Sequence, residues 1–139
     1  LDLFAGSGAL GLEALSRGAA SSLLIERDSR AAAQLKSNLD LLKADGGKVL
    51  QMDALGYLQR PATELPNAMF DVVFIDPPFR KGLALPCCQA LEQHQWLTGD
   101  ALIYLETEKE CTTAEIPANW RLLKEKIAGQ LAYRLYQRS

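Results

Sequence analysis

The sequence has few of the residues that disulfide frameworks and metal sites require. Its 139 residues include three cysteines, with no CxxC pair, and one histidine. An odd number of cysteines, two of them adjacent at Cys87 and Cys88, does not fit a disulfide framework or a zinc site. The longest apolar runs, such as 72–75, fall far below the roughly 18 residues that a membrane-spanning helix needs. We therefore expect no metal and no membrane span.

Neither positive nor negative charge is in large excess. Fifteen Lys and Arg residues against 17 Asp and Glu residues give a net charge of −2 and a pI near 5.4. This excludes a protein that holds nucleic acid by bulk positive charge alone, although it leaves room for a local basic face.

The apolar content of 48% is enough for a core in a chain of one-domain length. We expect a single cytoplasmic domain over residues 1–139, and a monomer. The chain opens within an apolar run at Leu1 and has no initiator methionine there. We therefore also expect that an N-terminal segment of the parent protein is missing.

Short apolar runs alternate with helical patterns along most of the chain. The runs that predict the first five strands lie at 1–5, 22–26, 48–52, 70–75 and 101–105. The unalternated run 70–75 is typical of a strand that is buried on both faces of a parallel sheet. Two further runs, 120–127 and 131–136, flank a turn at 128–130 and predict an antiparallel hairpin. The pattern predicts an α/β fold with a mostly parallel seven-stranded sheet that ends in this C-terminal hairpin.

A glycine-rich turn follows the first expected strand. The stretch Gly6-Ser7-Gly8-Ala9-Leu10-Gly11 fits the pattern GxGxxG between a strand and a helix. Glycines there allow a tight turn, close approach of the backbone to a ligand, and close packing of helix on strand. Alone, the pattern also fits an ordinary turn.

Two acids end the next two expected strands. Glu26 lies where dinucleotide-binding folds place an acid, and its carboxylate can accept hydrogen bonds from two ribose hydroxyls. A surface acid or a helix-capping acid is the alternative. Asp53 can accept a hydrogen bond from an adenine amino group while the backbone N–H of Ala54 contacts a ring nitrogen; it can equally cap the short helix that follows.

The most informative stretch, Asp76-Pro77-Pro78-Phe79, ends the fourth expected strand. The two prolines have no N–H donors, so they end the strand and leave the Pro77 carbonyl free of the sheet. A fixed carboxylate and carbonyl beside an aromatic ring form a receptor for a flat ring that carries an amine, with about 1–3 kcal/mol from stacking. A structural turn with an incidental Phe is the alternative.

Four motifs thus lie at the ends of expected strands: the glycine-rich turn, Glu26, Asp53 and the stretch 76–79. Parallel strands place their carboxyl ends at one edge of the sheet. We therefore expect these four motifs to converge on one cleft.

In this order the motifs resemble those of class I S-adenosylmethionine-dependent methyltransferases that methylate amines. The stretches 3–18, 76–82 and 117–138 closely resemble the bacterial small-subunit (16S) ribosomal RNA guanine-N2 methyltransferases, and the resemblance covers essentially the whole chain. It implies a Rossmann-like fold, S-adenosylmethionine as the cofactor, and ribosomal RNA or the small ribosomal subunit as the partner. Family members also carry a basic segment before the first strand, and we expect that segment to be the part of the parent protein that is missing.

The resemblance implies a role for each matching residue. Asp2 would hold the methionine end of the cofactor together with Gly6, Ser7 and Gly8. Glu26 would bind the ribose, and Asp53 with Ala54 would bind the adenine. Asp76, Pro77, Pro78 and Phe79 would hold a target guanine flipped out of its stack.

For several other residues the sequence gives less support for a functional role. Arg80 and Lys81 either contact phosphates that flank the base or form an ordinary solvated pair. Arg134 and Arg138 are expected to be surface charges, and His94 to lie on the surface. Cys87 and Cys88 are expected in the core of a helix.

Three other functions compete with this interpretation. GxGxxG with Glu26 also suits a nicotinamide-dependent oxidoreductase, although hydride transfer does not require the motif at 76–79. A methyltransferase that acts on adenine N6 or on another RNA, DNA or protein amine would share the same receptor. The last alternative is a non-catalytic RNA-binding or assembly module, which the intact receptor motif and the net charge of −2 disfavour.

Overall fold

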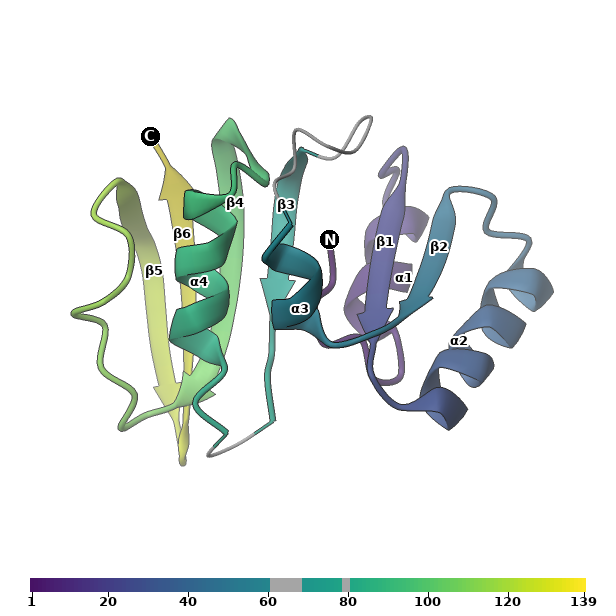
Figure 1. The fold of residues 1–139 in the computed structure, drawn as a ribbon, viewed down its shortest axis with the longest axis horizontal. Helices are drawn as coiled ribbons and strands as arrows, with labels where there is room; N and C mark the ends of the chain where they lie inside the picture. The colour runs from purple at the N-terminus through teal and green to yellow at the C-terminus, as the bar shows by residue number, and fades with distance from the viewer. Residues whose placement is uncertain (61–68, 79–80) are drawn as a thin grey trace. The chain divides into compact units, whose positions relative to one another are not determined.

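The computed structural model describes residues 1–60, 69–78 and 81–139, and its backbone is drawn in Figure 1. Contacts divide the chain into two compact units, unit 1 over Leu1–Ala54 and unit 2 over Leu55–Ser139. The expected single domain over residues 1–139 stays a prediction. No helix in these described ranges is long and apolar enough to cross a membrane.

Unit 1 is built from parallel strands and two helices. Its elements are α1 (Ala9–Ser16), β1 (Ser22–Glu26), α2 (Ser29–Leu42) and β2 (Gly47–Gln51). β1 and β2 pair in parallel, with Leu24 opposite Val49. Ahead of β1, Asp2 forms a single parallel bridge to Leu24. The carboxyl ends of these paired segments therefore lie at one edge within unit 1.

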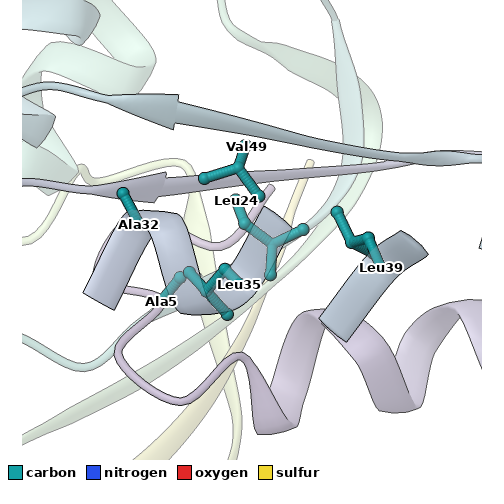
Figure 2. Close-up of a cluster of buried hydrophobic side chains, with 6 residues drawn as sticks. All are labelled: Ala5, Leu24, Ala32, Leu35, Leu39 and Val49. Atoms are coloured by element: carbon teal, nitrogen blue, oxygen red, sulfur yellow. The ribbon is translucent and has the colours of Figure 1, made fainter. Parts of the chain in front are cut away.

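For helix α2 the sequence predicts a cap at Asp28 or Ser29 and an apolar stripe of Ala32, Leu35, Leu39 and Leu42. The cap is confirmed at Asp28, and the stripe is confirmed except for Leu42, which is exposed. The carboxylate of Asp28 accepts a hydrogen bond from the backbone N–H of Ala31 at 2.8 Å and so caps the first turn. The buried residues Ala32, Leu35 and Leu39 recur on one face. Figure 2 shows this stripe facing the strands, where Leu24 and Val49 complete the core of unit 1 together with Ala5.

Unit 2 contains a four-stranded mixed sheet. Its elements are α3 (Ala54–Leu58), which begins at the last residue of unit 1, β3 (Phe70–Ile75), α4 (Ala84–Gln93), β4 (Leu97–Glu108), β5 (Trp120–Ala128) and β6 (Leu131–Arg138). The strand order is β3-β4-β6-β5. β3 pairs with β4 in parallel, whereas β6 runs antiparallel to both β4 and β5. The predicted C-terminal hairpin is thus confirmed.

One face of this sheet is tightly covered. Helix α4 lies over β4 and β6 (Figure 1), and its Cys87, Cys88 and Leu91 are fully buried, as expected for a helix core. The strands contribute alternating buried side chains such as Ile103 and Leu105 of β4. The edge strand β5 is exposed from residue 121 to 128 and carries several charges, which discourages pairing with another sheet edge.

The expected seven-stranded sheet is not confirmed. In the described ranges the chain forms six strands, arranged as a two-stranded and a four-stranded sheet. The first expected strand, 1–5, is reduced to the bridge at Asp2 because the backbone turns at Leu3 and Phe4. Two hydrogen bonds remain around that bridge, from Asp2 N to Leu23 O at 2.9 Å and from Ile25 N to Asp2 O at 2.8 Å.

The expectation that Arg134 is a surface charge is wrong. Its residue is only 6% exposed, because β6 alternates and Arg134 points to the same buried face as Ala132 and Tyr136. Arg138 does lie nearer the surface, and its guanidinium pairs with Glu92 at 2.8 Å. His94 follows α4 as its C-terminal cap and is half-buried.

Candidate functional site

In unit 1 the glycine-rich turn and the acid of β1 are joined directly. The backbone N–H of Gly6 donates a hydrogen bond to Oε1 of Glu26 at 2.8 Å. Gly6 and Gly8 have φ angles of 54° and 82°, a left-handed conformation that side chains other than glycine's rarely adopt. Two residues that are 20 positions apart in the sequence are therefore in contact at the carboxyl end of β1.

The glycines also let the turn pack closely against its neighbours. A Cβ atom at Gly8 would collide with the side chain of Leu35. A Cβ atom at Gly11 would lie 3.0 Å from the side chain of Leu24 in β1. At Gly6, by contrast, a Cβ atom would meet no described atom within 4 Å, so the turn is open on that side. Close helix–strand packing and an accessible backbone are both realised.

Asp2 is a carboxylate held in the interior of unit 1. It is 2% exposed, and its Oδ2 accepts a hydrogen bond from the backbone N–H of Gly11 at 3.3 Å. Its other oxygen, Oδ1, is buried and has no hydrogen-bond partner among the described residues. Burial raises the pKa of Asp2 to about 6, and the nearby carboxylate of Glu26 acts in the same direction. A buried polar atom without a partner is costly, so its presence needs an explanation.

Both carboxylate oxygens of Glu26 accept a backbone hydrogen bond, yet the group keeps lone pairs for a ligand. Its Oε2 accepts a hydrogen bond from the backbone N–H of Asp28 at 2.8 Å, in addition to the bond from Gly6. A carboxylate has about four lone-pair sites, so it can still accept hydrogen bonds from hydroxyls. The backbone N–H of Met52 donates to the Glu26 carbonyl at 3.1 Å, which brings the end of β2 beside the end of β1. The next residue, Asp53, is exposed at this edge, and Ala54 is buried at the start of α3.

In unit 2 the receptor motif follows β3 directly. Asp76 and Pro77 are half-buried and Pro78 is exposed. Burial raises the pKa of the Tyr104 hydroxyl on β4, with further contributions from Glu106 and from the Asp76 carboxylate. Asp76 therefore lies near a tyrosine in a region of negative charge.

Phe79, the last residue of the receptor motif, lies outside the described residues, as does Arg80, a predicted phosphate contact. Lys81 is described and exposed.

A cavity of about 250 Å³ opens beside the two prolines. The residues that line it from α4, β4 and the following loop include Leu83, Thr107, Glu108, Cys111 and Glu115. Sequence reasoning did not select these residues. A signal was available, because Thr107 and Glu108 follow the fifth expected strand and so lie at the same sheet edge as the end of β3.

One residue that lines this cavity, Thr107, is held by an ion pair in which the arginine is buried and the glutamate is exposed. The Arg134 guanidinium contacts Glu125 with an Nε to Oε2 distance of 2.7 Å, and its Nη1 donates to the hydroxyl of Thr107 at 3.3 Å. Thr107 is 3% exposed and donates in turn to the carbonyl of Glu108 at 2.9 Å. A charge this deeply buried is tolerated because it is paired and hydrogen-bonded.

The structure thus brings Asp2, the Gly6–Gly8 turn and Glu26 together in unit 1, with Asp53 at the same edge. In unit 2 it brings Asp76 and the prolines beside a cavity. The convergence of both sets on one cleft stays a prediction. Within residues 1–60, 69–78 and 81–139, no three His, Cys, Asp or Glu side chains are grouped to hold a metal ion.

The alternation of parallel strands and helices, with a glycine turn after the first strand segment, is the Rossmann-like α/β fold of class I methyltransferases. The solved structure of the Escherichia coli protein yhhF matches with a TM-score of 0.90 and 50% identity, over 99% of this chain and 73% of that chain. A Haemophilus influenzae structure matches with a TM-score of 0.91 and 46% identity, over 99% and 84% of the two chains.

The chain belongs to the family described as Conserved hypothetical protein 95, which matches residues 1–137. Its curated relatives include Ribosomal RNA small subunit methyltransferase D of Escherichia coli K12, which is 51% identical over 99% of this chain and 67% of that protein. The Haemophilus influenzae protein of the same name is 48% identical, over 99% and 70%. The resemblance to small-subunit ribosomal RNA methyltransferases is confirmed. These names do not specify the base, so guanine N2 stays a prediction.

Proposed function

We propose that this protein transfers a methyl group from S-adenosylmethionine to the exocyclic N2 amine of a specific guanine in small-subunit ribosomal RNA. The observation that carries the proposal is the buried carboxylate of Asp2 beside a glycine turn that is bonded to Glu26. Relatives named as ribosomal RNA methyltransferases support the substrate class. A cytoplasmic location follows from that substrate.

The residues of unit 1 fit S-adenosylmethionine. The partnerless Oδ1 of Asp2 and the open side of Gly6 suit the methionine end, whose ammonium group carries hydrogen-bond donors. We assign Gly6, Ser7 and Gly8 to the same end. Glu26 is assigned to the ribose hydroxyls because its carboxylate has lone pairs left after its two backbone bonds.

Asp53 and Ala54 are assigned to the adenine ring. Asp53 is exposed at the edge where β1 and β2 end, so its carboxylate can accept from the adenine amino group. The backbone N–H of Ala54 follows at the start of α3, where helical N–H groups have no intrahelical partner.

When bound, the cofactor supplies a methyl group on a positively charged sulfur, which an amine can attack in line. The N2 of guanine is a weak nucleophile because its lone pair is delocalised into the ring. Asp76 and the Pro77 carbonyl accept its two hydrogens, which raises the electron density on nitrogen and orients the lone pair. The nitrogen would become acidic only once it is methylated, and its proton would then pass to the Asp76 carboxylate, which already accepts one of its hydrogens. Asp76 therefore acts mainly by positioning, and it does not need to be a strong base.

Phe79 is assigned to stacking on the flipped base, with Pro78 fixing the backbone before it. Arg80 and Lys81 are assigned to phosphates that flank the base. For Phe79 and Arg80 these roles rest on the sequence, because both lie outside the described residues.

The proposed role of Asp76 is tested by Asp76→Ala, with methyl transfer to ribosomal RNA and calorimetric binding of S-adenosylmethionine as the two measurements. We expect methyl transfer to fall to background while cofactor affinity is retained. Asp71→Ala is the matched control, because Asp71 is an exposed acid on the same strand, β3. Turnover by Asp76→Ala close to that of Asp71→Ala would refute the assignment.

Cofactor class is tested by titrating the protein with S-adenosylmethionine and, separately, with NADH. Micromolar binding of S-adenosylmethionine alone supports the proposal. Binding of NADH alone would instead favour the nicotinamide-dependent oxidoreductase.

A further inference from the structure

We infer that Glu108 selects guanine over adenine, by accepting a hydrogen bond from the ring N1–H of the base whose N2 amine is held at Asp76 and Pro77. The inference rests on the proposed function and adds a residue that determines specificity. It addresses a property that the receptor motif alone leaves open, because a carboxylate and a carbonyl can hold the amine of either purine.

The first observation is the composition of the cavity beside the receptor motif. Its volume of about 250 Å³ equals that of roughly eight water molecules, and both Pro77 and Glu108 line it. Pro77 follows β3 and Glu108 ends β4, and these two strands are parallel neighbours. The two residues therefore face one space from adjacent strand ends.

The second observation is that the polar side chains of this wall offer acceptors. The Thr107 hydroxyl already donates to the Glu108 carbonyl at 2.9 Å, and the Cys111 thiol donates to the Thr112 carbonyl at 3.7 Å. The remaining polar side chains of the lining are the carboxylates of Glu108 and Glu115. Pro77 and Pro78 have no N–H at all.

A carboxylate acceptor at this position matches one purine and opposes the other. The Watson–Crick edge of guanine presents donors at N1 and N2, and a flipped base is read by hydrogen bonds to this edge. Adenine presents an acceptor at N1, which would face the carboxylate of Glu108 without a proton between them. Selectivity arises as much from this unfavourable pairing as from the favourable one.

The backbone that presents the Glu108 side chain is anchored by two hydrogen bonds. Its carbonyl accepts from the Thr107 hydroxyl and from the backbone N–H of Cys111 at 3.1 Å. Thr107 is held by the buried guanidinium of Arg134, which is paired with Glu125. The end of β4 is therefore fixed by Thr107, which lines the cavity, and through it by Arg134, which does not, so Arg134 acts as a positioning residue.

The test replaces the target guanine by 2-aminopurine, which keeps the N2 amine but has an acceptor at N1. The methylated guanine is first located by mass spectrometry, and 2-aminopurine is then introduced at that position by ligation. Initial rates with both RNAs are measured for the wild-type protein, Glu108→Gln and Glu108→Asp. Glu110→Gln is the matched control, because Glu110 is an exposed acid two residues away that does not line the cavity.

We expect the wild-type protein and Glu110→Gln to prefer guanine, and Glu108→Gln to reduce that preference at least tenfold, because an amide can also donate to the N1 of 2-aminopurine. Glu108→Asp should retain the preference at a lower rate. An unchanged preference in Glu108→Gln, or an equal loss of rate on both RNAs, would overturn the inference. If the wild-type protein methylates no guanine N2, the proposed function itself fails, which is a separate result.

Discussion

Replacing Asp2 by asparagine tests whether unit 1 keeps a buried charge for the sake of a ligand. Asp2 is 2% exposed, and burial raises its pKa from the ordinary value of 3.8 to about 6. At neutral pH the folded chain therefore holds a carboxylate that the unfolded chain would solvate better. A pKa difference of 6 − 3.8 ≈ 2.2 corresponds to about 3 kcal/mol of lost stability. An asparagine side chain at this position would carry no charge and would fill nearly the same space.

The pH window follows from proton binding. Between pH 3.8 and 6 the folded chain binds more protons at Asp2 than the unfolded chain does, so the free energy of unfolding falls as the pH rises through that window. Asp2→Asn lacks this dependence. We expect the variant to match the wild-type protein near pH 4 and to be more stable by up to about 3 kcal/mol at pH 7.5.

The assay is urea unfolding at several pH values between 4 and 7.5, combined with calorimetric titration of S-adenosylmethionine at pH 7.5. Affinity for the cofactor should fall at least tenfold, because asparagine lacks the negative charge that we assign to the ammonium group at the methionine end of the cofactor. Asp45→Asn is the control, since it removes an exposed carboxylate from the same unit. A stability difference that does not vary with pH would refute the raised pKa. Unchanged cofactor affinity would refute the assigned role of Asp2.

Two further substitutions test the packing around the site. Gly8→Ala should destabilise unit 1 more than Gly18→Ala by about 1–3 kcal/mol in denaturant unfolding, because both glycines have positive φ but only at Gly8 would the new Cβ collide, with Leu35. Equal losses would show that the collision is relieved without cost. In unit 2, Trp96→Phe should cost about 1–3 kcal/mol, because the buried Nε1 of Trp96 donates to the Leu58 carbonyl at 2.9 Å and phenylalanine leaves that carbonyl unsatisfied. A loss well below 1 kcal/mol would mean that water replaces the donor.

Local patterns predicted much of unit 1. The capping acid Asp28 and the residues Ala32, Leu35 and Leu39 of the stripe on α2 depend on spacings within one helix. The hydrogen bond between Gly6 and Glu26 was not predicted, although both residues were expected at the same sheet edge. Strand β3 also has the predicted bounds, because an unbroken β-branched and aromatic run has few other interpretations.

The cavity in unit 2 could not be found in the same way. Thr107 and Glu108 carry no motif, and the expected strand ended at 105, whereas β4 extends from Leu97 to Glu108. That extension depends on pairing with β6, since Thr107 lies opposite Ala132 and Glu108 opposite Leu131. Tertiary pairing of this kind leaves little trace in a single strand's sequence.

The alternation of residues along strand β6 explains why Arg134 was wrongly expected on the surface. In the sequence its large apolar side chains Leu131, Tyr133 and Leu135 alternate with residues that include Arg134, which predicts that arginine on the solvent side. The structure buries the other set, with Ala132 and Arg134 against the covered face. Alternation fixes which residues share a face but not which face is inside when both carry apolar groups.

The buried position of Arg134 is acceptable because Glu125 on β5 neutralises the guanidinium and Thr107 on β4 accepts a hydrogen bond from it, so three strands are linked at the wall of the cavity. A hydrophobic residue at 134 would fill the space with less desolvation cost. It would leave the hydroxyl of Thr107, and hence the end of β4 that presents Glu108, without its fixed donor.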